Sequence, residues 1–270
     1  MTNYISLTAI IFYLLSAFSL ARTLFQVEED ARRRFRSHFF ICGYAALMFH
    51  AVILYQHIDI AGGLNFGFYN ALSLMSWAVS LLIMLGALSK PLENLAVAIF
   101  PVTAMALVFE IVFPSRLILP DSAPLGLLIH VLLSVCAYSL LTLAAFQSVL
   151  LALQDRQITL KHPASIMRLP PMQIMEDLLI KIIALGFFML SLSLATGLMF
   201  VQNLFAQHLV HKTVLSLLAW FIFGTLLWGH WTRGWRGKTA IRWTIGGFLS
   251  LMLAYFGSKL VLELILKRVG

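Results

Sequence analysis

The sequence predicts an all-α, polytopic integral membrane protein, a helical bundle of about eight transmembrane helices. Three observations support this prediction. The chain has 270 residues, of which 61% are hydrophobic and only 11% are charged, whereas soluble domains carry about 25% charged residues. The mean hydropathy of +0.92 is correspondingly high. The apolar residues are gathered into stretches of about 20 residues or more, which is the length that a helix needs to cross a bilayer.

Eight such stretches follow one another along the chain, and the connections between them are short. We therefore expect a single transmembrane domain over residues 1–270. The longest connection, 155–176, contains Pro163, Pro170 and Pro171, so it cannot form one continuous helix. The first stretch has neither a basic segment before it nor a small-residue cleavage site after it, and we interpret it as a retained helix. The predicted spans are 4–22, 37–57, 65–88, 93–113, 125–153, 177–204, 212–231 and 243–265.

Lysine and arginine residues predict the orientation of these spans. The loops after the first, third, fifth and seventh spans carry thirteen of them, whereas the other loops and the C-terminus carry four. Loops rich in Lys and Arg stay in the cytoplasm. Both termini are then expected on the outer, periplasmic side of a bacterial inner (plasma) membrane, with membrane lipid around the helices. Because these loops also account for the net charge of +8, we expect no nucleic-acid partner.

The sequence contains no constellation that is typical of an enzyme. A Gly-rich phosphate loop, a serine nucleophile motif and a carboxylate pair suited to acid–base catalysis are all missing from it. Cys42 and Cys136 lie in separate apolar stretches and lack the spacing of a metal-binding or redox pair. We therefore expect that the protein itself catalyses no covalent chemistry.

Histidines within the spans, or at their ends, are the candidate ligands for a metal or cofactor. His50 lies well inside the second span, His130 opens the fifth on the outer side, and His230 ends the seventh on the cytoplasmic side. Neutral imidazole binds haem iron and other transition metals through one nitrogen. A zinc site would bring cysteines or carboxylates close in sequence, and none accompany these histidines. A hydrogen-bonded structural role is the alternative for each of them.

The connection between the last two spans, 228–238, contains three tryptophans, three basic residues and His230. A histidine flanked by aromatic rings at a membrane interface favours a flat, apolar, metal-centred ligand such as haem. Trp228 and Trp231 are the aromatic candidates beside it. The same residues would equally anchor a helix end, since tryptophans gather at membrane interfaces.

Glu110 is a charged residue within the fourth span, near its outer end. It is interpreted either as part of a proton or ion path or as a side chain that reaches the outer interface. A transporter of small solutes is a weaker hypothesis, because the third and sixth spans lack the paired helices broken by Gly and Pro that transporters often have.

Two stretches of the second half carry a resemblance to a known family. Residues 128–154 open with His130, and residues 212–257 contain a Gly-Trp-Arg-Gly turn at 234–237 and a Tyr-Phe-Gly sequence at 255–257. Both stretches resemble, in the same order, the C-terminal spans of the cytochrome c assembly family (CcsA/HemX-like). The overall size and the eight spans are also similar to inner-membrane members of that family.

The resemblance implies a membrane protein that binds or handles haem and is linked to cytochrome biogenesis. In the family, histidines hold haem beside a tryptophan-rich outer loop. His130 matches the outward histidine before that loop, and His230 matches the intramembrane histidine after it. Both are the candidates for ligation of the haem iron, with His50 as a third cofactor-binding candidate.

Two features differ from the family pattern. The interval 198–211, where the tryptophan-rich loop is expected, contains neither tryptophan nor aspartate, and no histidine follows the last span. The missing loop favours an alternative, in which the protein is a structural or regulatory subunit that binds no haem and acts through a partner membrane protein.

Overall fold

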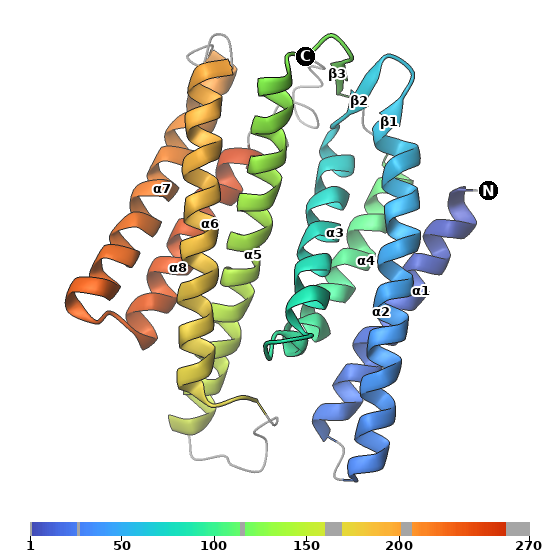
Figure 1. Cartoon of the computed structure of the whole chain (residues 1–270), viewed down its shortest axis with the longest axis vertical. Helices are drawn as coiled ribbons and strands as arrows, with labels where there is room; N and C mark the ends of the chain where they lie inside the picture. The colour runs from blue at the N-terminus through green and yellow to red at the C-terminus, as the bar shows by residue number, and fades with distance from the viewer. Residues whose placement is uncertain (1, 26–27, 114–116, 160–168, 201–206, 258–270) are drawn as a thin grey trace. The chain divides into compact units, whose positions relative to one another are not determined.

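The computed structural model describes residues 2–25, 28–113, 117–159, 169–200 and 207–257 (Figure 1). Within these ranges the prediction of an all-helical membrane protein is confirmed, because eight helices are long and apolar enough to cross a membrane. The helices are α1 (Thr2–Phe25), α2 (Glu29–Ile58), α3 (Phe68–Gly86), α4 (Ala96–Val112), α5 (Leu125–Thr159), α6 (Met172–Phe200), α7 (Gln207–Arg233) and α8 (Gly237–Met252). A 3-10 turn, η1 (Glu93–Leu95), precedes α4, and a π-helical segment, η3 (Leu253–Gly257), follows α8.

Several helices extend beyond the apolar stretches that predicted them. α2 begins at Glu29, eight residues before the predicted span, and α5 continues to Thr159. Backbone hydrogen bonding continues along the helix after it leaves the hydrocarbon, and the added turn of α2 carries exposed arginines. The predicted ends of the sixth and eighth spans, at residues 204 and 265, lie outside the described residues.

The helices fall into two compact units. Unit 1 comprises Met1–Asp121 with Ser165–Pro170, and unit 2 comprises Ser122–Ala164 with Pro171–Gly270. In unit 1, α1 packs against α2 and α4, and α3 packs against α2 and α4. In unit 2, α5 packs against α6 and α8, and α7 packs against α6 and α8. A single transmembrane domain over the whole chain stays a prediction.

Aromatic rings form the centre of unit 1. The Phe100 ring centroid lies 5.2 Å from that of Tyr13 and 6.0 Å from that of Phe39, and all three side chains are fully buried. Gly43 of α2 adds a close helix contact, since a Cβ atom there would lie 2.7 Å from the Met84 sulfur of α3. Small residues at such positions allow membrane helices to approach closely.

A three-stranded antiparallel sheet at one end of unit 1 was not predicted. Its strands are β1 (Asp59–Ile60), β2 (Gly63–Asn65) and β3 (Ile118–Pro120), in that spatial order. Gly63 makes the sheet possible, because its φ is +139° and a Cβ atom there would lie 2.0 Å from the Leu119 carbonyl oxygen. The sheet ties the α2–α3 connection to the segment before α5.

Candidate functional site

His130 lies near the start of α5 and is held by the last turns of α6. Its Nδ1 atom is 2.8 Å from the Ser193 carbonyl oxygen, so Nδ1 carries the proton and donates. The Ser134 and Ser193 hydroxyl groups, 2.7 Å apart, join the same two helices one turn further on. These bonds fix the imidazole in one tautomer and one orientation.

Gly197 allows the His130 ring to lie directly against the α6 backbone. A Cβ atom at position 197 would lie 3.0 Å from the Cε1 atom of His130 and 3.2 Å from its Nδ1 atom. Any larger residue would therefore push the ring away. The half-buried ring is thus seated in a gap that this glycine provides.

The remaining nitrogen of His130, Nε2, carries the lone pair of the neutral ring. Among the residues that the structure describes, none forms a hydrogen bond to it. Histidines that bind metals usually donate the other ring N–H to a carboxylate or a backbone carbonyl. His130 has this arrangement, so its Nε2 atom has the geometry of a metal-binding nitrogen.

A cation lies near the same end of unit 2. Lys212, at the start of α7, places its Nζ atom 4.7 Å from the centroid of the Tyr255 ring. The Tyr255 ring is in turn 5.4 Å from that of Tyr138, centroid to centroid. A cationic side chain at this end of unit 2 would suit an anionic group.

His230 closes the turn that ends α7. Its Nδ1 atom donates to the Trp235 carbonyl oxygen over 2.9 Å. Gly234 has a φ of +67°, and its N–H donates to the His230 carbonyl oxygen over 3.0 Å, which is the left-handed glycine ending of many helices. The local geometry therefore gives His230 a structural role, while its Nε2 atom keeps the lone pair.

His130 and His230 lie at opposite ends of unit 2. α6 runs antiparallel to both α5 and α7, so these two helices run in the same direction (Figure 1). His130 is near the start of α5 and His230 is near the end of α7, a helix roughly 40 Å long at 1.5 Å per residue. One iron atom therefore cannot bind both histidines.

The two tryptophans that were predicted to accompany His230 face away from the unit. Trp228 is 68% exposed and Trp231 is 70% exposed. The ring that contacts the turn belongs instead to Trp235, which covers Gly229 and stacks on Trp243 at 5.5 Å between centroids. Trp228 and Trp231 have the positions of interfacial anchors.

His50 has no nitrogen left for a ligand. In the interior of unit 1 it is fully buried. Its Nδ1 atom is 3.1 Å from the Tyr13 hydroxyl, and its Nε2 atom is 2.9 Å from the Ser73 hydroxyl. A buried imidazole with both nitrogens paired is a structural residue, so His50 does not fit a haem ligand.

Sequence reasoning did not predict the pairing of His57 with Glu110. The His57 Nδ1 atom is 2.8 Å from the Glu110 Oε1 atom. The other carboxylate oxygen of Glu110 is buried and has no hydrogen-bond partner among the described residues. The available signal was that both residues lie near the predicted outer ends of their spans, the second and the fourth, although they are 53 positions apart.

Among the described residues, no three His, Cys, Asp or Glu side chains come together as metal ligands would. The donor groups that this part of the chain offers are single imidazoles, and His130 is one of those whose Nδ1 atom is paired while Nε2 keeps its lone pair.

Comparison with known proteins decides the family. The family model described as "Cytochrome C assembly protein" matches residues 38–266. The chain belongs to this family. It is 34% identical over 222 residues to the Escherichia coli K12 inner membrane protein YpjD, covering 82% of this chain and 84% of YpjD. Together with the eight apolar helices, this similarity identifies a multi-pass protein of the inner membrane.

A more distant relative has a name that states a function. The chain is 22% identical over 229 residues to the cytochrome c biogenesis protein CcsA of Prochlorococcus marinus MIT 9303, covering 72% of this chain and 71% of that protein. No solved structure matches the chain.

Proposed function

We propose that this family member binds or handles haem within the membrane, in connection with cytochrome biogenesis, and that His130 is the iron ligand. The observation that carries the proposal is the hydrogen bond from Nδ1 of His130 to the Ser193 carbonyl oxygen. This bond leaves Nε2 with a lone pair and a fixed direction, which is what ligation requires.

The chemistry of the ligand matches the donors that the chain offers. Haem would supply an iron atom that needs few ligands from the protein, and the His130 imidazole would hold it. α5 and α6 position this imidazole, and Gly197 keeps the space for its ring. The neutral ring binds and the protonated ring does not, so acid would release the ligand. The proposal assigns no covalent chemistry to the chain.

The proposed orientation places both chain termini on the outer side of the membrane. It rests on the thirteen basic residues in the loops after odd-numbered spans. In this orientation the start of α5, and with it His130, faces outward, and the Trp-rich turn after α7 faces the cytoplasm.

An absorbance spectrum of the purified full chain, oxidised and then reduced with dithionite, tests the proposal. We expect a Soret band in the natural protein that His130→Ala removes, whereas His38→Ala, at an exposed position of α2, keeps it. His230→Ala is measured separately, because His230 lies at the opposite end of unit 2. A colourless protein that stays colourless after haem is added would overturn the proposal.

A second candidate function is that of a structural or regulatory subunit that binds no haem and contacts another membrane protein. The exposed Trp228 and Trp231, followed by exposed Arg233 and Arg236, favour it, since aromatic and arginine side chains are enriched at protein interfaces. If Arg233→Ala and Arg236→Ala abolish cellular function while His130→Ala does not, this second function is the correct one.

A further inference from the structure

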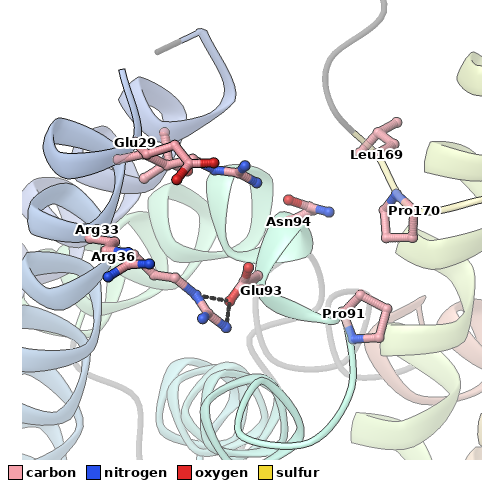
Figure 2. A pocket seen from close by; sticks show the side chains of 10 residues that line it. Glu29, Arg33, Arg36, Pro91, Glu93, Asn94, Leu169 and Pro170 are labelled. Atoms are coloured by element: carbon pink, nitrogen blue, oxygen red, sulfur yellow. Dashed lines mark hydrogen bonds and ion pairs between the residues drawn. The ribbon is translucent and has the colours of Figure 1, made fainter. Parts of the chain in front are cut away.

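A cavity of about 460 Å³ opens at the arginine-rich end of unit 1. Its walls come from the end of α1, the first turns of α2, the α3–α4 connection and residues 169–170, as Figure 2 shows in part. The lining residues all belong to unit 1, whereas His130 belongs to unit 2, and what the cavity binds does not depend on haem binding. Its charged and amide side chains are Arg32, Arg33, Arg36, Glu29, Glu93 and Asn94.

One arginine of the cavity is already paired. The Arg36 Nη2 and Nε atoms lie 2.9 Å and 3.0 Å from Glu93 Oε2, and this bridge joins α2 to η1 (Figure 2). The pair is neutral as a whole and forms a wall of the cavity. The other charged residues of the lining therefore determine which ligands the cavity attracts.

Besides the Arg36–Glu93 pair, the cavity lining contains two arginines and one carboxylate. Within the described residues, the side chains of Arg32 and Arg33 form no hydrogen bond or ion pair, and Glu29 is the remaining acid of the lining. Guanidinium groups present several N–H donors in a planar fork that matches a phosphate or carboxylate. The cavity therefore has an excess of unpaired donors suited to an anion.

The cavity lies at the level where lipid headgroups are found. Thr23 is the last residue of the first membrane span and Glu93 is the first residue of the fourth, and both line the cavity. Basic pockets between membrane helices at the cytoplasmic boundary bind the headgroups of acidic lipids. The volume also falls within the usual range of small-molecule sites, about 300–1,000 Å³, so a phosphate with an attached glycerol fits.

We propose that this cavity binds a phosphate-bearing anion through Arg32 and Arg33, and that the phosphate belongs to the headgroup of an acidic phospholipid. Asn94 is placed to bind a headgroup hydroxyl. The Arg36–Glu93 pair holds the α2 wall in place. Glu29 opposes binding, because its carboxylate repels the phosphate.

Binding to the purified full chain in a neutral detergent tests the site. The probes are dioctanoyl phosphatidylglycerol, dioctanoyl phosphatidylcholine, glycerol 3-phosphate and inorganic phosphate, with native mass spectrometry or thermal shift as the readout. Arg32→Gln and Arg33→Gln are each expected to weaken phosphatidylglycerol binding about tenfold, the loss of one charge-assisted contact. Arg34→Gln is the matched control, because Arg34 belongs to the same arginine run, is exposed and does not line the cavity.

Tight binding of phosphatidylglycerol with weak binding of the soluble phosphates supports the lipid source. Binding of glycerol 3-phosphate as tight as that of phosphatidylglycerol supports the same site with a soluble ligand. Equal binding of phosphatidylglycerol and phosphatidylcholine, or an equal loss in Arg34→Gln, overturns the proposal, because the effect would then be general surface charge.

Glu29→Gln gives a test that does not depend on loss of function. Removal of the opposing carboxylate is expected to tighten phosphatidylglycerol binding severalfold, whereas a residue with only a structural role would not produce a gain. Unchanged or weaker binding in Glu29→Gln, with the helical circular dichroism spectrum intact, counts against the site.

Discussion

His50 in unit 1 and His130 in unit 2 are both membrane histidines, yet their surroundings give them opposite capacities. His50 is fully buried and pairs both ring nitrogens with hydroxyl groups, of Tyr13 and Ser73. His130 pairs one nitrogen with a backbone carbonyl and leaves the other free among the described residues. Burial and residue type therefore do not decide whether a histidine can bind a ligand, because one ring nitrogen must also be left unpaired.

His50→Ala is expected to have the largest effect, a loss of about 4 kcal/mol in the free energy of unfolding. Two buried hydroxyl groups lose their partner, at about 1–3 kcal/mol each, and a cavity is left. Unfolding of the purified protein in detergent measures the loss, with His38→Ala as the exposed control. A stable His50→Ala protein without a Soret band would reverse the comparison and make His50 the ligand.

His57→Ala tests whether His57, a partly buried histidine of unit 1, pairs with the Glu110 carboxylate and does not bind a metal. Without His57, the buried Glu110 loses its partner, and we expect a destabilisation of about 3 kcal/mol. Glu110→Gln removes the charge and should cost about 1 kcal/mol. The double variant is therefore expected to be more stable than His57→Ala alone. Strictly additive effects in the double-mutant cycle would show that the two residues are not coupled.

Gly197→Ala tests the position of the His130 ring in unit 2. The added Cβ atom would lie 3.0 Å from Cε1 of His130, so the ring must move and haem occupancy should fall severalfold in the Soret absorbance. Gly246→Ala on α8 is the control, because nothing lies within 4 Å of a Cβ atom there. An Ala in a helix normally stabilises by about 0.5–1 kcal/mol, and we expect this gain at position 246 but not at 197.

The smallest expected effects concern the turn after α7. If His230 only closes this turn, His230→Ala and Gly234→Ala should each lower stability by about 1 kcal/mol and leave the spectrum unchanged. Gly234 has a φ of +67°, at which an L side chain is strained by about 1–2 kcal/mol. A changed spectrum in His230→Ala with normal stability would instead assign a ligand role to His230.

The order of the spans could be predicted from the sequence, and the helix ends could be predicted only approximately. The predicted start of the second span at residue 37 reflects where the apolar run begins, whereas α2 begins at Glu29, because a helix is not obliged to end at the hydrocarbon boundary. The small sheet depends on contacts between Gly63 and Leu119. Gly63 lies in the connection between α2 and α3, and Leu119 lies in the connection between α4 and α5. No periodic pattern in the sequence predicts that they pair.

The candidate site was predicted in part. His130, His230 and His50 were singled out from the sequence because polar residues are costly within a membrane. Their roles could not be assigned from the sequence, because the partners of His50 and His130 lie 23 to 63 positions away along the chain. The same holds for Glu110, whose partner on α2 lies 53 positions away and is brought to it by the packing of unit 1.

The residues alone identify the chain as an all-helical membrane protein with eight spans and as a member of its family. A helix that crosses a bilayer must be long and apolar, and both its length and its composition can be read from the residues. The tertiary structure alone decided which nitrogen of each histidine is free, that His130 and His230 are far apart, and that arginines line a cavity. Membrane helices are apolar on all sides, so no sequence period marks the inward face, and only packing reveals which residues meet.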